Sequence, residues 1–270
     1  MKETRTSRVL RATVEYDGTR YRGWQSQMNA RTVQGVFYGA VKPVLGEGTR
    51  IFGSGRTDAG VHALGQVASL SLERSVPVPE LPRLRRAIND GLPPDVHVLA
   101  LEPAPPGFHA RHDAALRIYR YRISRRRTAF GKPWVWWVKD PLDAAAMKKA
   151  AALLAGRHDF ASFCENAPGH DSTLVEVAWA KVETPASVPD LIVFRIAASH
   201  FLWKMVRRLV GTLVEVGTGR MPAPKVAVLL AEKSPEPARF TAPPSGLFLE
   251  TVVYEGDPAP PEIDPLRPGW

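Results

Sequence analysis

The sequence predicts an α+β protein made of two similar split β-α-β halves, which form a largely antiparallel sheet with helices on one side and a cleft between the halves. Strand-like alternation and helix-like periodicity follow the order β-α-β-β-α-β, and this order returns loosely further along the chain. The proline-rich segment 103–106 separates the two stretches. A chain of 270 residues with 44% hydrophobic content can bury a sizeable core.

The first half begins with an alternating strand over residues 7–16, which ends at the turn signal Asp17-Gly18. Thr32 can cap a helix over residues 33–44, because a threonine side chain accepts hydrogen bonds from the first helical N–H groups. The next strand of the expected order is poorly marked. A clearer strand covers 66–72, a short helix covers 79–89 with Gly91 just past its end, and a strand over 96–101 completes the half.

The second half begins with a strand over 116–124, in which tyrosines alternate with arginines on opposite faces. An alanine-rich helix covers 144–154, strands cover 174–182 and 191–197, helices cover 201–216 and 225–232, and a final strand covers 247–254. We therefore expect one half over residues 1–105, the other over 106–256, and a proline-rich, flexible tail over 257–270.

Composition limits the classes of partner. The net charge of +9 and the isoelectric point near 9.9 favour a polyanion, above all nucleic acid, although a solvated basic surface is the plainer alternative. The single cysteine, Cys164, excludes an intramolecular disulfide and fits a reducing cytoplasm. The sequence indicates no signal peptide and no membrane span. The spacing of His109 and His112 is more typical of a polar loop than of a metal site, so we expect no metal.

The most informative segment is the loop Phe52–Ala63, which places Asp58 close to Arg56 in a run with three glycines. Glycine allows tight turns and a close approach of ligand to backbone. A nearby guanidinium keeps a carboxylate ionised, and a fixed, ionised aspartate can act as a nucleophile or a base. A surface turn with a structural salt bridge is the alternative interpretation.

Two clusters of basic residues lie in the second half, one along the strand over 116–124 and one on the helix over 201–216. On that helix the cations recur at i, i+3 and i+4, opposite a broad apolar side. Together with the net charge they predict salt-sensitive contacts to RNA phosphates. The residues expected to make these contacts are Arg120, Arg122, Lys204 and Arg208. Tyr119, among the arginines, is either a base-stacking ring or a half-buried core residue.

The ordered motifs resemble the tRNA pseudouridine synthase A family. Besides the Asp58 loop, the similarity includes residues 16–19, 23–27, 31–35, 108–111, 117–121, 156–160, 205–211 and 242–249. It therefore extends from about residue 8 to about residue 255. The chain departs from the family pattern at Trp203 and Lys204, where histidines are common, and the proline-rich tail is not part of the resemblance.

The resemblance implies an isomerase that converts uridine to pseudouridine in the tRNA anticodon stem-loop, at the family's positions 38–40, without a cofactor. It implies a cytoplasmic enzyme that is usually a homodimer, with the active site in the cleft between the halves. By the same resemblance, Asp58 is the catalytic carboxylate and Arg56 holds the target base out of the stem. Tyr119 stacks on that base, Arg207 keeps Asp58 charged, and Leu247 lines the base pocket.

Two other functions fit the same residues. A non-catalytic RNA-binding protein would also have basic grooves and aromatic rings, but a lone carboxylate near RNA phosphates argues against it. A hydrolase with Asp58 as general base would usually pair that base with a metal or a second acid, and the sequence offers no clear second acid nearby.

Overall fold

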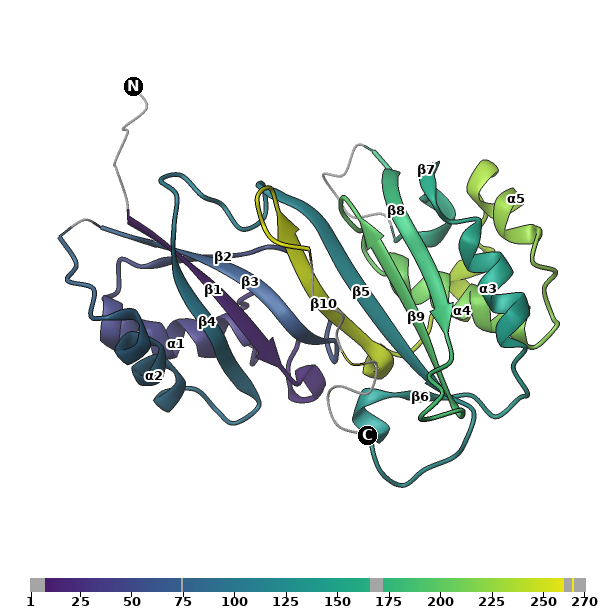
Figure 1. Ribbon diagram of the computed structural model, residues 1–270, viewed down its shortest axis with the longest axis horizontal. Helices are drawn as coiled ribbons and strands as arrows, with labels where there is room; N and C mark the ends of the chain where they lie inside the picture. Colours follow the sequence, from purple (N-terminus) through teal and green to yellow (C-terminus); the bar gives the residue numbers. More distant parts are fainter. Residues whose placement is uncertain (1–7, 74, 166–171, 260–263, 265–270) are drawn as a thin grey trace. The chain divides into compact units, whose positions relative to one another are not determined.

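The computed structural model describes residues 8–73, 75–165, 172–259 and 264 (Figure 1). The chain divides into two compact units, which are described separately. Unit 1 comprises Met1–Ala115 and Leu249–Pro258, and unit 2 comprises Leu116–Phe248 and Ala259–Trp270. The predicted boundary between residues 105 and 106 stays a prediction, as does the flexible tail, most of which lies outside the described residues.

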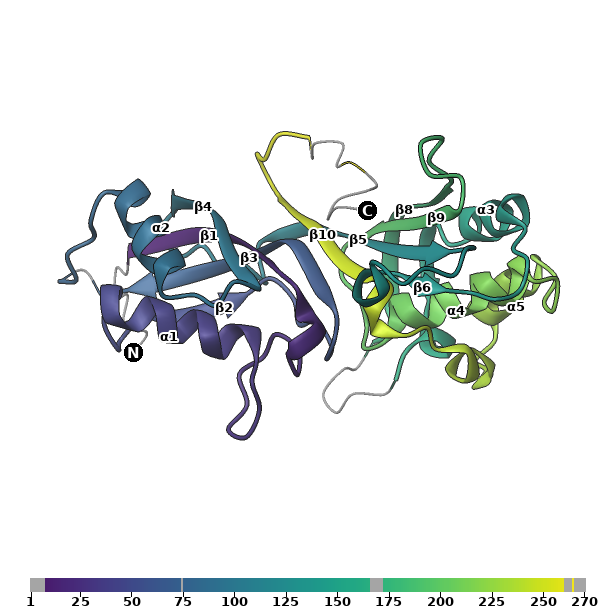
Figure 2. The same cartoon turned by 90° about the horizontal axis from the view of Figure 1, so that it is seen from below.

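Unit 1 is built around β1 (Arg8–Tyr16), which pairs antiparallel with both β3 (His62–Leu72) and β4 (Val96–Ala104). The short β2 (Arg50–Gly53) pairs with β3 and is the poorly marked strand of the predicted order. Two helices, α1 (Val33–Leu45) and α2 (Leu81–Asp90), pack on each other and against these strands (Figure 2). The Thr32 side chain accepts a hydrogen bond from Gly35 N, which confirms the predicted helix cap.

Unit 2 has four successive antiparallel strands in the order β5-β9-β8-β7. Their bounds are β5 (Ala114–Ser124), β7 (Gly156–Asp159), β8 (Leu174–Glu183) and β9 (Leu191–Ala198). The two-residue β6 (Trp136–Trp137) adds a parallel pairing to β5. The helices are α3 (Ala144–Ala152), α4 (Met205–Gly217) and α5 (Lys225–Ala231), of which α3 packs against β8 and α4.

The final strand, β10 (Leu247–Tyr254), contributes its first two residues to unit 2 and the rest to unit 1. The α+β class and the mostly antiparallel pairing are confirmed. The positions of β6 and β7 were not predicted, because strands of two and four residues are too short to show a period.

Helix α4 begins four residues later than its apolar periodicity predicts, because Lys204 has a left-handed backbone with φ of 61°. The predicted apolar side of the helix is buried, including Met205, Leu209 and Leu213. A Cβ on Gly211 would lie 1.6 Å from the Phe240 carbonyl oxygen. Glycine is therefore needed where the chain around Phe240 packs on α4.

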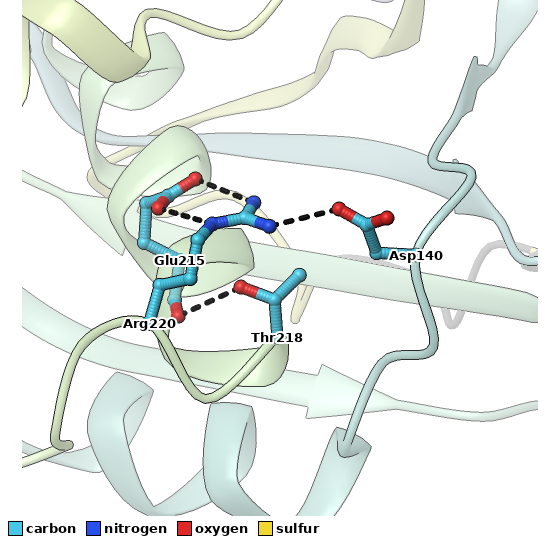
Figure 3. Close-up of polar contacts among 4 residues, drawn as sticks. All are labelled: Asp140, Glu215, Thr218 and Arg220. Atoms are coloured by element: carbon cyan, nitrogen blue, oxygen red, sulfur yellow. Dashed lines mark hydrogen bonds and ion pairs between the residues drawn. The ribbon is translucent and has the colours of Figure 1, made fainter.

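The C-terminal end of α4 is fixed by an ion-pair network around Arg220 (Figure 3). The Arg220 guanidinium donates to both carboxylate oxygens of Glu215 at 2.8 and 2.9 Å, and to Asp140 Oδ2 at 2.8 Å. Thr218 Oγ1 donates to the Glu215 carbonyl oxygen at 3.0 Å. The network therefore ties the end of α4 to the segment that precedes α3.

Candidate active site

The glycine loop connects β2 to β3 in unit 1, and the Asp58 side chain on it is half-buried. The loop entry is fixed to β3. Ser54 N donates to the Val67 carbonyl oxygen at 2.8 Å, and Ser54 Oγ donates to Gln66 Oε1 at 2.6 Å. Gln66 Nε2 in turn donates to the Gly55 carbonyl oxygen at 3.0 Å. These three hydrogen bonds fix the position of the residues that lead to Asp58.

The backbone on both sides of Asp58 is held as well. The Thr57 carbonyl oxygen accepts from Trp24 N at 3.1 Å, and the Asp58 carbonyl oxygen accepts from Val61 N at 3.1 Å. The Tyr16 hydroxyl and Thr57 Oγ1 share a buried hydrogen bond of 2.8 Å. The carboxylate of Asp58 therefore projects from a loop whose backbone has little freedom to move.

Two glycines outside the loop allow it to pack against the segment that follows β1. A Cβ on Gly23, where φ is 93°, would lie 2.5 Å from the Thr57 carbonyl oxygen and 3.2 Å from the Asp58 carbonyl carbon. A Cβ on Gly18 would lie 1.9 Å from the Val61 carbonyl oxygen. Larger residues at either position would displace the loop, which gives a physical reason for glycine in both segments.

The Asp17 and His62 side chains meet next to the loop, with His62 Nδ1 3.0 Å from Asp17 Oδ1. Burial by itself would raise the pKa of Asp17, but the hydrogen bonds from His62 and Thr19 outweigh it and leave the pKa well below its ordinary value. Burial also raises the pKa of Tyr16 above its ordinary range, so the hydroxyl that contacts Thr57 stays protonated well into alkaline pH.

Arg56 lies on the exposed side of the loop. Its Nε donates to Gln25 Oε1 at 3.2 Å. The Gln25 amide donates to Gln34 Oε1 at 2.9 Å, and Gln34 Nε2 reaches the Ile51 carbonyl oxygen, so this chain of amides leads back to β2. The guanidinium is therefore oriented by unit 1 while it stays accessible to solvent.

The other predicted site residues belong to unit 2. Tyr119 on β5 pairs with Ile196 of β9, is 8% exposed, and meets the Phe201 ring edge-on with centroids 4.9 Å apart. Arg207 on α4 donates from Nε to the Ala242 carbonyl oxygen at 2.7 Å. Leu247 is buried at the start of β10.

The segment 242–247 links these unit 2 residues. Tyr121, which shares a face of β5 with Tyr119, donates its hydroxyl to the Pro243 carbonyl oxygen at 2.7 Å. A Cβ on Gly246 would lie 2.5 Å from the Tyr121 ring. Burial holds the pKa of Tyr121 well above its ordinary value, although the positive charge of Arg207 acts in the opposite direction. One segment thus contacts α4 through Arg207 and β5 through Tyr121 before it reaches Leu247.

Arg120 and Arg122 do not fit the predicted role in phosphate contact, because both side chains are 0% exposed. Arg120 Nη1 donates to the carbonyl oxygen of Asp264 at 2.8 Å. Burial, with a contribution from the neighbouring Arg120, lowers the pKa of Arg122 to about 10. The alternation along β5 was predicted correctly, but both faces of the strand are covered. Part of the cover on Arg120 comes from Asp264, near the other end of the chain.

Lys204 and Arg208 are directed toward one acid. Lys204 Nζ forms an ion pair with Glu165, and Arg208 Nη2 lies 3.7 Å from Glu165 Oε2. Arg208 also donates to the Cys164 carbonyl oxygen. The two cations remain partly accessible, so the phosphate contacts predicted for them stay predictions.

The histidine pair of the sequence interacts through its rings. The centroids of His109 and His112 lie 4.3 Å apart, and Phe52 packs on His109 at 4.9 Å. Among the described residues, no group of three or more His, Cys, Asp or Glu side chains could hold a metal ion. In the same part of the chain, no helix combines the length and the apolar character that crossing a bilayer requires.

Sequence reasoning did not assign a role to the side chains that hold the loop, Tyr16, Thr57 and Gln66. Tyr16 and Thr57 lie inside the motifs that carry the family resemblance, and this was the one indication in the sequence that they contribute to the site. Their contacts with the loop depend on the packing of β1, the loop and β3 against one another, which no local sequence pattern contains.

Comparisons with known proteins agree with the motifs. A family model described as tRNA pseudouridine synthase matches residues 12–113 and 150–255. A protein of Thermoanaerobacter sp. (strain X514), named tRNA pseudouridine synthase A, is 40% identical over 251 residues, which are 92% of this chain and 100% of that protein. Proteins of the same name from Myxococcus xanthus and Moorella thermoacetica are each 42% identical, over 93% and 91% of this chain and 94% and 99% of their own length.

A solved structure of a Cbf5-Nop10-Gar1 complex also matches, with a TM-score of 0.31 and 10% identity over 76% of this chain and 54% of that chain.

Proposed function

The chain belongs to the tRNA pseudouridine synthase family, and we propose that it isomerises uridine to pseudouridine in the anticodon stem-loop of tRNA, at positions 38–40. The observation that carries this proposal is the half-buried carboxylate of Asp58 on a loop held by hydrogen bonds on both sides. The net charge of +9 suits an RNA substrate.

The reaction balances without a cofactor. The N1–C1′ bond of the uridine breaks, the uracil turns, and a C5–C1′ bond forms. The proton on C5 goes to solvent, and N1 gains a proton. The base has to leave its stack before a protein carboxylate can reach it.

We propose that Asp58 is the nucleophile, which attacks either C1′ of the ribose or C6 of the uracil. A fixed carboxylate suits this role because little reorganisation is needed at the moment of attack. Arg56, exposed and oriented by Gln25, would hold the base out of the stem. Tyr119 would stack on the base and assist removal of the C5 proton, Arg207 would keep the carboxylate charged, and Leu247 would line the base pocket.

The test is the release of tritium from an anticodon stem-loop transcript that carries [5-³H]uridine. We expect Asp58→Asn to lower the rate of release by at least about 10²–10⁴-fold. Its affinity for the stem-loop should stay within about twofold of wild type, because loss of a negative charge does not weaken binding to a polyanion.

Asp90→Asn is the matched control. Asp90 is exposed at the end of α2 in the same unit, so the variant makes the same change in charge away from the loop and should retain full activity. Tight binding with no pseudouridine from wild type would favour a binding module. Free uracil among the products would favour a hydrolase.

We also propose that the enzyme is a cytoplasmic homodimer, with tRNA in contact with both subunits, as the family resemblance implies. The reduced state expected of the single Cys164 supports the compartment. Light scattering in solution tests the dimer, and a monomer at all concentrations with full activity would contradict it.

A further inference from the structure

The turn between β9 and α4, residues 199–204, holds an exposed indole in a constrained position. Trp203 is 45% exposed, which is unusual for a tryptophan. The residues around it are buried or packed: Leu202 is buried, Met205 begins α4, and Phe201 packs on Tyr119. Packed residues on both sides of Trp203 therefore fix the turn, while the indole itself is exposed to solvent.

The backbone of this turn is strained at the next residue. Within the described part of the chain, Lys204 is the single non-glycine residue with a positive φ, at 61°. An L-residue seldom adopts this conformation unless its surroundings enforce it, and such positions are frequent at binding sites. The enforcing contacts are Glu165 N to the Trp203 carbonyl oxygen at 3.1 Å and Arg208 N to the Lys204 carbonyl oxygen at 3.0 Å.

The Lys204 side chain covers one face of the indole. Lys204 Nζ lies over the Trp203 ring, 5.0 Å from its centroid, and its ion pair with Glu165 keeps it there. A cation on one face of an indole leaves the other face for a second planar partner. Aromatic rings beside lysine or arginine are the usual means of holding unpaired bases.

We propose that Trp203 stacks on an unpaired base of the RNA substrate. This inference rests on the proposed function for the identity of the RNA, and it adds a substrate-binding residue to it. The turn joins β9, which pairs with β5 at Tyr119, to α4, which carries Arg207. A base stacked on Trp203 is therefore held by the same elements that position Tyr119 and Arg207.

The charges around the indole favour RNA over a second copy of this chain. Lys204, which lies over the ring, shares Glu165 with Arg208, so these two cations and one acid carry a net positive charge. Cores of protein–protein interfaces are depleted in charged residues, whereas a polyanion gains from the surplus of cations.

The experiment compares Trp203→Ala, Trp203→Phe and Trp137→Ala in the full chain. Trp137 is the matched control, since it is 38% exposed and has Arg127 5.5 Å from its ring centroid, but lies on the regular strand β6. The readouts are the dissociation constant of a fluorescently labelled anticodon stem-loop RNA, and kcat and KM for pseudouridine formation.

We expect Trp203→Ala to raise the dissociation constant and KM about tenfold, with kcat within about twofold of wild type. Trp203→Phe should recover most of the affinity, and Trp137→Ala should match wild type. Stacking involves no counterion release, so the slope of affinity against salt concentration should be the same for Trp203→Ala as for wild type.

A dissociation constant within twofold of wild type for Trp203→Ala would overturn the proposal, as would equal losses for the Ala and Phe variants. A change of Trp203→Ala from dimer to monomer in light scattering would assign the indole to a second copy of the chain instead. If Trp203→Ala does not fold, Trp203→Gln replaces it as the non-aromatic variant. The binding assay is repeated in the Asp58→Asn background, where it reports on affinity without catalysis. If the wild type binds the RNA but does not isomerise it, that result contradicts the proposed function and leaves the role of Trp203 in binding intact.

Discussion

The buried hydrogen bond between Tyr16 and Thr57 connects the stability of unit 1 to the position of Asp58, and Tyr16→Phe removes it. The substitution deletes one oxygen and leaves Thr57 Oγ1 without this partner in a buried position. The loss of a buried hydrogen bond with one group left behind costs about 1–3 kcal/mol. We therefore expect the free energy of unfolding to fall by about 2 kcal/mol at pH 8.

The difference in the free energy of unfolding between wild type and Tyr16→Phe should become smaller at alkaline pH. Burial raises the pKa of Tyr16 in the folded protein above that of an unfolded tyrosine, which is about 10. Such a group contributes stability that is fully present below the unfolded pKa and is lost as the pH rises toward the folded pKa. The loss amounts to about 1.4 kcal/mol for each pH unit above 10, and phenylalanine has no corresponding loss.

The measurement is urea unfolding of wild type and Tyr16→Phe between pH 8 and pH 11. The difference in stability should be constant up to about pH 9.5 and should shrink by about 1.4 kcal/mol by pH 11. All other titrating groups are common to both proteins and cancel. Because Thr57 precedes Asp58, we also expect kcat for pseudouridine formation to fall about tenfold.

Tyr38→Phe is the control, since the Tyr38 hydroxyl donates to the Glu47 carbonyl oxygen in an exposed hydrogen bond of 2.9 Å. It should lower the free energy of unfolding by less than about 0.5 kcal/mol at pH 8. A difference between wild type and Tyr16→Phe that stays constant or grows up to pH 11 would refute the reasoning about burial.

The remaining predictions concern the loop support and the end of α4. Gly23→Ala should lower the free energy of unfolding in urea by about 2 kcal/mol or more and reduce activity, because its Cβ would meet the Thr57 carbonyl oxygen at 2.5 Å. Gly39→Ala on α1 is the control, since a Cβ there has nothing within 4 Å. It should leave the free energy of unfolding unchanged or raise it by up to about 1 kcal/mol. Arg220→Lys should lower stability by about 0.5–1 kcal/mol, because lysine cannot make the two parallel bonds to Glu215. That loss should diminish in 1 M salt, and a loss that stays unchanged there would argue against an ionic origin.

The sequence determined the class of fold and the family of this protein. Alternation of period two and apolar periodicity of helical spacing are local properties, so most strands and helices, and the cap at Thr32, could be predicted from neighbouring residues. The Asp58 loop was recognisable for a similar reason, because the glycines and the acid lie within a few positions of one another.

The tertiary structure decided which side chains are accessible and what holds the Asp58 loop. Arg120 and Arg122 alternate as an exposed face would, yet β5 is covered on both sides. Whether a strand is covered depends on segments far away in the sequence, and no local pattern contains that information. The left-handed Lys204 is likewise enforced by long-range contacts, because its backbone conformation is unfavourable for an isolated lysine and becomes stable only where Glu165 and Arg208 fix the turn.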